Sequence, residues 1–142
     1  MPKEINTTYD VNVNVLLDIL KSKLYNRFDF SNTIYTEWDK NIRTVNYSIS
    51  AIKETNVTER QEIIVMNKNS YHINYKQIYD NLPFETTLYI NIEKNGSKTL
   101  MNIDYNLSFT KKCHTKFIYN KWIESNISSI YDRFNKEILE SI

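Results

Sequence analysis

The chain has 142 residues, of which 41% are hydrophobic and 25% are charged, and its formal net charge is +1. This length and balance are typical of a globular domain with an enclosed core, so we expect a single domain spanning residues 1–142 and exclude a disordered chain. The near-zero net charge provides no bulk attraction to nucleic acid or to an anionic membrane. The only cysteine, Cys113, excludes an intrachain disulfide and a cysteine-based metal cluster.

No apolar segment approaches the length of about 20 residues that is needed to cross a bilayer. The first residues, Met-Pro-Lys-Glu-Ile-Asn, lack the apolar core of a signal peptide. We therefore expect a cytoplasmic location and no integral association with a membrane.

The N-terminal segment predicts a strand followed by a helix. Residues 4–11 alternate and include Thr, Tyr and Val, as expected for a strand. Asp10 or Asn12 can then cap an amphipathic helix that extends to about Phe28. The polar and aromatic segment 29–41 predicts a short helix or an ordered loop.

From residue 45 the hydrophobic period changes to two, which predicts five strands joined by short links. The expected strands cover residues 45–51, 57–66, 71–79, 84–93 and 101–109. The Asn95-Gly96 pair, which contains the only glycine, is the strongest hairpin signal in the chain. One side of these strands is consistently polar, so we expect the sheet to face water on that side and to bury the other.

The last segment, residues 116–142, predicts one long helix. Its apolar side chains recur at spacings of three and four and so lie on one stripe: Tyr119, Ile123, Ile127, Ile130, Phe134 and Ile138. Such a helix extends about 40 Å, longer than the core of a small domain, and only the sheet is broad enough to cover its stripe. Lys111, Lys112 and Lys116, near the start of this helix, are interpreted as a solvated turn.

Two short features accompany this order of elements. Tyr35-Thr-Glu-Trp38 follows the first predicted helix, and Asn81-Leu-Pro-Phe84 links two predicted strands. They are similar to the aromatic-x-x-Trp and the mid-sheet connection of the START-like superfamily, which includes Bet v 1-type proteins, polyketide cyclases and aromatases, and ubiquinone-binding proteins. The turn at residues 53–56 lacks the glycine-rich loop of Bet v 1 relatives, which argues against the plant-allergen branch.

The order of elements over nearly the whole chain resembles the helix-grip fold of this superfamily. The resemblance implies an α+β fold in which a curved antiparallel sheet of about six strands wraps around the long C-terminal helix. One or two short helices are expected after the first strand.

The resemblance also implies a binding site between the sheet and the long helix. The candidate ligand-binding residues are those expected to face this space: Trp38, Tyr47, Tyr71, Tyr75, Ile90, Ile103, Tyr105, Ile127, Tyr131 and Phe134. A solid hydrophobic core is the competing interpretation, because burial alone accounts for most of these residues. Trp38 with Tyr35 can form a lid over the site or plug the end of the sheet.

We therefore expect the chain to bind or carry a hydrophobic or amphipathic small molecule, lipid- or polyketide-like, without a cofactor or metal. Two alternatives stay open: a polyketide cyclase- or aromatase-like enzyme, and a protein-interaction module of the chaperone co-activator kind. The enzyme requires a general acid or base, but the alternation is interpreted as placing no carboxylate or histidine on the inward-facing side. Glu62, His72 or Asp104 inside the site would favour the enzyme. The sequence specifies neither the ligand nor the oligomeric state.

Overall fold

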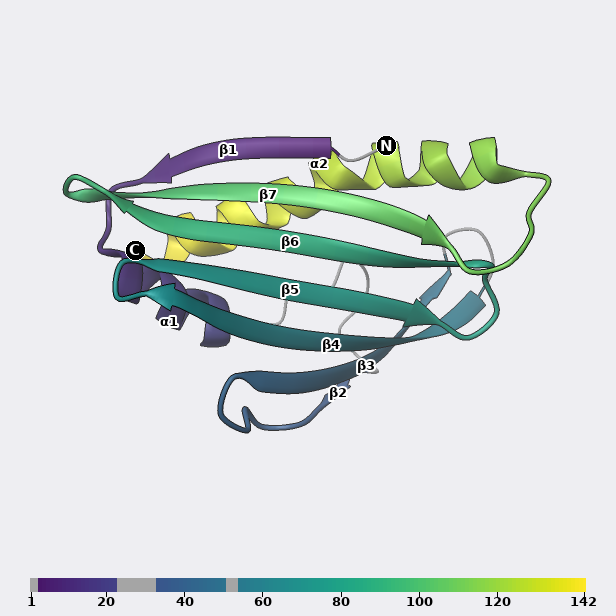
Figure 1. The fold of residues 1–142 in the computed structure, drawn as a ribbon, viewed down its shortest axis with the longest axis horizontal. Helices are drawn as coiled ribbons and strands as arrows, with labels where there is room; N and C mark the ends of the chain where they lie inside the picture. The colour runs from purple at the N-terminus through teal and green to yellow at the C-terminus, as the bar shows by residue number, and fades with distance from the viewer. Residues whose placement is uncertain (1–2, 23–32, 51–53) are drawn as a thin grey trace.

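The computed structural model describes residues 3–22, 33–50 and 54–142, and its strands form one open antiparallel sheet with both helices on the same face (Figure 1). The elements in chain order are β1 (Lys3–Tyr9), α1 (Val13–Ser22), β2 (Ile34–Tyr35), β3 (Ile42–Ser50), β4 (Glu54–Asn67), β5 (Ser70–Tyr79), β6 (Phe84–Asn95), β7 (Lys98–Phe109) and α2 (Lys116–Ser141). The order across the sheet is β1-β7-β6-β5-β4-β3-β2. The first strand therefore lies beside the last one.

The register of the sheet aligns alternate residues into rows across its inner face, the face that carries the helices. One row consists of isoleucine alone, one from each of five adjacent strands: Ile63, Ile73, Ile90, Ile103 and Ile5. Side chains paired in this way lie within about 5.5 Å of one another at their Cβ atoms, so they pack as a continuous apolar surface. This row is part of the floor of the main apolar cluster.

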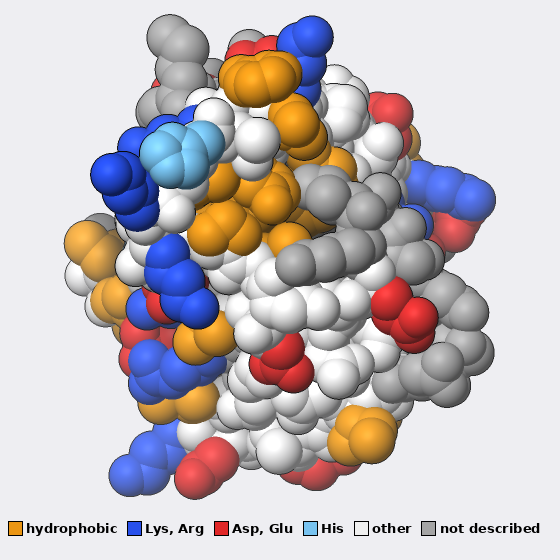
Figure 2. Space-filling model, turned by 90° about the vertical axis from the view of Figure 1, so that its right-hand side faces the viewer, with side chains coloured by type: hydrophobic (Ala, Val, Ile, Leu, Met, Phe, Trp, Pro, Cys, Tyr) orange, Lys and Arg blue, Asp and Glu red, His pale blue; other side chains and the backbone are white. Residues whose placement is uncertain are grey.

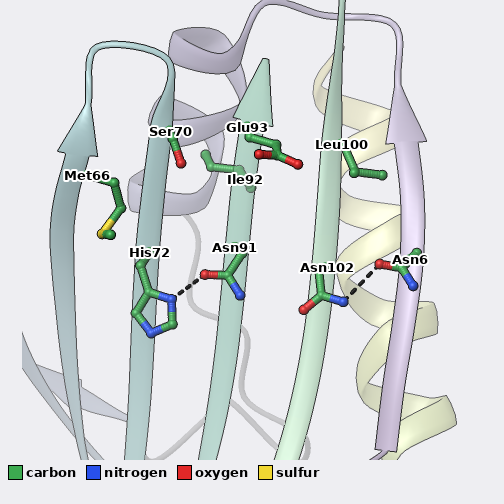
Figure 3. A pocket seen from close by; sticks show the side chains of 9 residues that line it. All are labelled: Asn6, Met66, Ser70, His72, Asn91, Ile92, Glu93, Leu100 and Asn102. Carbon is green, nitrogen blue, oxygen red and sulfur yellow. Dashed lines mark hydrogen bonds between the residues drawn. The ribbon is translucent and has the colours of Figure 1, made fainter. Parts of the chain in front are cut away.

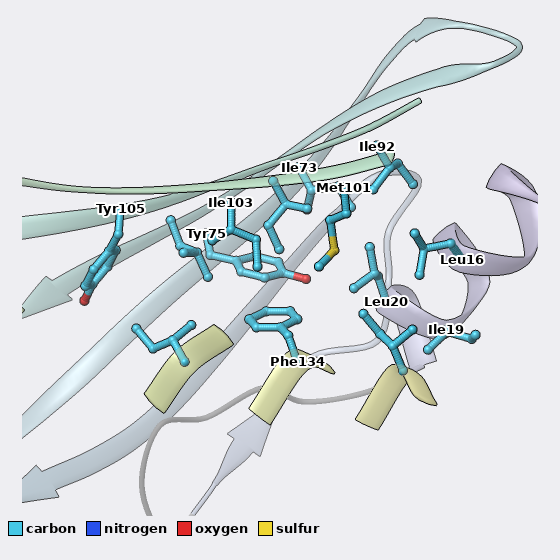
Figure 4. Packing of buried hydrophobic residues seen from close by; sticks show 14 of the residues in the cluster. Leu16, Ile19, Leu20, Ile73, Tyr75, Ile92, Met101, Ile103, Tyr105 and Phe134 are labelled. Atoms are coloured by element: carbon cyan, nitrogen blue, oxygen red, sulfur yellow. The ribbon is translucent and has the colours of Figure 1, made fainter. Parts of the chain in front are cut away.

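The long helix α2 covers this surface, as the stripe of its sequence predicted. Its buried residues are Ile123, Ile127, Ile130, Phe134 and Ile138. Figure 4 shows Phe134 facing Tyr75 of β5 between helix and sheet, and the two rings stack with a centroid distance of 6.1 Å. At Phe134, therefore, the helix is packed down on the sheet.

Hydrogen bonds join α2 to the edge strand β1. Thr7 Oγ1 donates to the Tyr131 hydroxyl at 2.8 Å, and the Tyr9 hydroxyl donates to Asn135 Oδ1 at 2.9 Å. Burial, with a smaller contribution from Tyr131, raises the pKa of the Tyr9 hydroxyl well above its usual range. These contacts fix the N-terminal strand to the helix that ends the chain.

The helix α1 begins as predicted, because Asn12 Oδ1 accepts the backbone N–H of Asn14 at 2.8 Å. The predicted extension of this helix to Phe28 lies outside the described residues. A short helix was one expectation for the next segment, but residues 34–35 form β2, which pairs with β3. The free edge of β3 offers backbone hydrogen-bonding groups that this segment uses, so the sheet gains a seventh strand.

The β6–β7 hairpin is present, but its turn is shifted by one residue from the predicted pair. Asn95 pairs with Lys98, so the two loop residues are Gly96 and Ser97. Gly96 has a φ of 66°, and Ser97 is not among the described residues with positive φ. Glycine therefore takes the first central position, as in a type II′ turn.

Candidate functional site

A band of buried polar side chains crosses the inner face of the sheet. Its members come from β3, β4, β5 and β6, and we call them the polar band: Arg43, Glu59, Gln61, Gln77 and Thr86. The exposed fractions of Arg43, Glu59 and Gln61 are 5%, 3% and 1%. Arg43 pairs with Gln61 across the strands, Glu59 with Gln77, and Gln77 with Thr86. Polar side chains so deeply buried must satisfy one another's hydrogen bonds.

Gln61 connects the two charged members of the band. Its Oε1 accepts from Arg43 Nε at 3.0 Å and from Arg43 Nη2 at 2.5 Å. Because a guanidinium can only donate, this contact fixes which end of the Gln61 amide is the oxygen. The Gln61 Nε2 atom must therefore donate to Glu59, and it does so to Oε2 at 2.6 Å.

The Glu59 carboxylate accepts hydrogen bonds from two further directions. Gln77 Nε2 donates to its Oε1 at 2.7 Å, and the Tyr47 hydroxyl donates to the same atom at 3.2 Å. An ionised carboxylate only accepts, so three donors converging on it form a consistent arrangement.

The donor chain extends from Glu59 to β6. Gln77 Oε1 accepts from Thr86 Oγ1 at 2.7 Å, and Thr86 Oγ1 also lies 2.7 Å from the Tyr79 hydroxyl. Because the single Thr86 proton is given to Gln77, the Tyr79 hydroxyl is the donor in the second contact. Hydrogen bonds thus run toward Glu59 both from Arg43 and from Tyr79.

Arg43 is held at the C-terminal end of α1. Its Nη1 donates to the backbone oxygen of Lys21 at 3.2 Å, and Trp38 Nε1 donates to the same oxygen at 2.9 Å. The guanidinium carbon lies 4.5 Å from the Trp38 ring centroid, within range of a cation–π interaction. Burial lowers the pKa of the Arg43 guanidinium, and the nearby Tyr75 and Glu59 oppose this shift.

Apolar clusters flank the polar band on both sides. Along β4, Ile63 belongs to the main cluster, Gln61 and Glu59 follow, and Val57 belongs to a second cluster. The buried residues of this second cluster are Val45, Tyr47, Ile49, Val57, Tyr79, Leu82 and Phe84. Tyr119 and Trp122 of α2 pack against it. The inner face thus alternates from apolar to polar to apolar along the strands.

The helix α2 lies to one side of the polar band. The helix runs close to β7, β1 and α1, and among the described residues it makes no comparable backbone approach to β3, β4 or β5. The stacked rings of Tyr75 and Phe134 nevertheless connect it to β5. The band therefore belongs to the part of the sheet that curves away from the helix axis.

The structure divides the predicted site residues into three groups. Trp38 contacts Arg43, Tyr47 contacts Glu59, and Tyr75 lies in the row beside Gln61. The second group belongs to the main apolar cluster: Ile90, Ile103, Tyr105, Ile127 and Phe134.

Tyr71 and Tyr131 form the third group, at the margins of the inner face. The Tyr71 hydroxyl donates to Asn14 of α1 at 2.9 Å, and the Tyr131 hydroxyl accepts from Thr7. Their hydroxyls thus connect elements of the fold. A ligand-binding role for any of the ten residues stays a prediction.

The expectation that no carboxylate faces inward is wrong. Glu59 shares the alternation of Val57 and Ile63 and is buried with them. The period of two, followed strictly along β4, would have found it. Glu62, His72 and Asp104 carry the opposite alternation and lie on the outer face of the sheet.

Val65 shares the alternation of Ile63, but its side chain is 56% exposed. It lies near the end of β4, where the register with β5 shifts between Val65 and Asn67. A shift of this kind twists the strand locally, so the last residues of β4 leave the covered part of the sheet.

A hollow of about 560 Å³ lies on the outer face, where His72, Asn91, Asn102 and Asn6 form a row across four strands (Figure 3). His72 Nδ1 contacts Asn91 Oδ1, and Asn102 Nδ2 donates to Asn6 Oδ1 at 2.8 Å. Most of its lining side chains are exposed or half-exposed, so water competes for every polar contact. The polar band, which excludes water, is the stronger candidate site.

Within residues 3–22, 33–50 and 54–142, no group of three or more His, Cys, Asp or Glu side chains is placed to hold a metal ion. Of the helices described, neither is both long and apolar enough to cross a membrane.

Neither protein-family models nor curated protein sequences give a match to this chain. Solved structures do. A conserved protein from Geobacillus kaustophilus is 14% identical, with a TM-score of 0.63 over 99% of this chain and 97% of that one. The Zhui aromatase/cyclase from Streptomyces sp. R1128 is 11% identical, with a TM-score of 0.62 over 99% and 90%. Human StAR-related lipid transfer protein 5 is 8% identical, with a TM-score of 0.67 over 98% and 76%.

These structural similarities extend over nearly the whole chain and confirm the resemblance that the sequence predicted. The seven-stranded antiparallel sheet and the long C-terminal helix are the elements that define the likeness. The chain has the helix-grip fold of the START-like superfamily.

Proposed function

We propose that the chain binds an amphipathic small molecule, lipid- or polyketide-like, on the inner face of the sheet beside α2. The observation that carries the proposal is the polar band between two apolar clusters. Small-molecule sites are usually apolar with a few fixed polar groups that orient the ligand. The apolar parts of such a ligand would lie against the clusters, and its polar group would hydrogen-bond with the band.

The energetics of burial support a role in recognition rather than in stability. A buried ion pair rarely stabilises a fold more than well-packed apolar residues of the same volume. Arg43 and Glu59 nevertheless lie among Val, Ile and Tyr side chains that would form a core without them. A buried site that hydrogen-bonds a ligand group rejects analogues that lack this group, so such polar side chains can discriminate between ligands.

The similar structures support the proposal at the level of the fold. One is a lipid transfer protein by name and another an aromatase/cyclase. The shared architecture makes binding between sheet and helix a reasonable expectation, while the ligand itself depends on residues that differ between these chains.

Two measurements test the proposal. Native mass spectrometry of the purified chain is expected to show a bound molecule. If the chain is purified without one, it is expected to bind added dodecanoic acid. Competition against the fluorescent probe anilinonaphthalene sulfonate then compares dodecanoic acid, which is a carboxylate at neutral pH, with its methyl ester, which carries no charge. We expect the acid to bind more tightly, because only its carboxylate can pair with Arg43.

Variants locate the binding within the fold. Tyr47→Phe removes one hydroxyl that contacts Glu59 and is expected to change the preference for the acid over the ester by about 2- to 10-fold. Tyr89→Phe, on the outer face, is the matched control and should leave this preference unchanged. Absence of any bound molecule together with absence of probe binding would overturn the proposal.

Glu59 favours a second candidate function, the cyclase-like enzyme, because that chemistry needs a carboxylate or histidine inside the site. The carboxylate is already engaged by three donors, so a substrate proton would have to displace one of them. Binding without reaction is therefore the better supported function. The enzyme would be the better supported function if the chain converts a poly-β-ketone thioester and the Glu59→Gln variant loses this activity while it still binds the probe.

A further inference from the structure

Apolar and basic side chains lie together at the end of the molecule where β7 passes into α2. Figure 2 views this end and shows hydrophobic side chains gathered in its upper part beside basic ones. Phe117 and Ile118, in the first turn of α2, are 65% and 44% exposed. Lys111, Lys112 and Lys116 are exposed in the preceding loop and in the same turn. We call these five residues the tip.

The positive charge of the tip is local. The chain as a whole has a net charge of +1, but no Asp or Glu lies between Asp104 and Glu124. The basic residues of this segment, apart from His114, are all lysines: Lys111, Lys112, Lys116 and Lys121. A negatively charged surface would therefore be attracted to this segment, although Asp and Glu side chains lie elsewhere on the same end of the molecule (Figure 2).

Folding accounts for little of the tip beyond the contact of Lys116 Nζ with the Phe109 ring, at 5.2 Å from its centroid. Tyr119 and Trp122, which follow it in α2, pack on Phe84 with ring centroids 4.9 and 5.7 Å away. Phe117 and Ile118 point away from this cluster and bury little. The first turn of α2 also has no acidic residue, and Thr115 forms no side-chain cap hydrogen bond. Lysines there oppose the helix dipole, so this composition weakens the start of the helix.

A bilayer surface with anionic headgroups matches both properties. Interfacial binding grows with the apolar area that enters the headgroup region and with electrostatic attraction to anionic lipid. We propose that the tip docks on an anionic lipid bilayer, with Phe117 and Ile118 entering the headgroup region and the lysines contacting the headgroups. The docked end is the one at which Tyr119 and Trp122 lead to the second apolar cluster.

Sedimentation of the full chain with vesicles tests the proposal. We expect binding to vesicles of phosphatidylcholine and phosphatidylserine in a ratio of three to one, and little binding to phosphatidylcholine alone. Changing the three tip lysines to Gln should lower the partition coefficient by about 100-fold, at about 5-fold per lysine. Phe117→Ser should lower it on the order of 10-fold.

Matched controls come from the other end of α2. Leu139 is 57% exposed, and Lys136 is an exposed lysine. Leu139→Ser and Lys136→Gln should therefore leave vesicle binding unchanged. Far-ultraviolet circular dichroism verifies that each variant is folded, and Ile118→Ser replaces Phe117→Ser if the latter is not.

The proposal is overturned if the chain binds neither vesicle, if it binds both equally, or if Leu139→Ser weakens binding as much as Phe117→Ser. Docking requires nothing of the polar band. Probe binding by the tip variants therefore separates a failure of docking from a failure of small-molecule binding.

Discussion

The polar band makes a quantitative prediction about Arg43 and Glu59. Arg43→Met keeps much of the side-chain volume but removes the guanidinium, so Gln61 Oε1 loses two donors and the Lys21 oxygen loses one. The Glu59 carboxylate is then buried without a cation. Arg43 and Glu59 are joined through Gln61 rather than by a direct contact, and leaving the buried groups of this network without their partners costs about 3–5 kcal/mol in total. We expect this decrease in the free energy of unfolding.

A double-mutant cycle isolates the interaction. Glu59→Leu alone should also destabilise strongly, because three donors lose their acceptor. The double variant leaves no isolated charge, so its loss should be smaller than the sum of the single losses by at least about 1 kcal/mol. Urea unfolding at neutral pH, followed by far-ultraviolet circular dichroism, provides the three values. Arg43→Gln, which also removes the positive charge, replaces Arg43→Met if the latter does not fold.

The surface pair Lys76–Glu85 is the matched control. Its Nζ and Oε2 atoms are 3.5 Å apart, with the two side chains 51% and 33% exposed. The same cycle there should give a coupling below about 1 kcal/mol. The explanation of the polar band is refuted if Arg43→Met and Glu59→Leu are additive within about 0.5 kcal/mol, the range expected of independent sites.

Two further predictions concern Asp104 of β7 and Tyr9 of β1. Burial, with a contribution from Glu4, raises the pKa of the Asp104 carboxyl, while the backbone N–H of Tyr105 opposes the rise. The folded state therefore binds this proton more tightly, and ionisation penalises the fold as pH rises through the folded pKa. Asp104→Asn should increase stability on the order of 0.5 kcal/mol at neutral pH and not near pH 3, as urea unfolding at both pH values would show. Tyr9→Phe leaves Asn135 Oδ1 without its donor and should lower the melting temperature, at about 1 kcal/mol of lost stability; an unchanged melting temperature would contradict this.

The regular part of the fold was predictable because the side-chain pattern alone determines it. The helical spacing from Ile123 to Ile138 predicted α2 almost to its last residue. The period of two likewise placed Ile73, Ile90 and Ile103 on one face, and the register joined them into a row. Neither pattern extends to segments held by neighbouring elements, which is why the pairing of β2 with β3 was missed.

The candidate site was only half predictable. The pattern points to Tyr47 and Tyr75 because they are apolar enough to suggest burial, whereas the polarity of Glu59 and Gln61 suggests exposure. Position along the strand, however, determines which face a side chain lies on, and polarity determines only the free-energy cost of burying it. The network also depends on the register, since Arg43 and Gln61 are 18 residues apart and meet only when β3 pairs with β4.

The packing of α2 decides where a ligand can lie. At Phe134 the helix rests on Tyr75, so its C-terminal half closes the main apolar cluster and leaves the sheet no free surface there. Trp122 and Tyr119, nearer the start of the helix, instead meet the second cluster with their rings tilted against Phe84, at interplanar angles of 52° and 54°. Because the polar band separates these two regions, the ligand proposed above would approach the band from the side of the second cluster. That side ends at the tip of α2, so small-molecule binding and membrane docking would use the same end of the molecule.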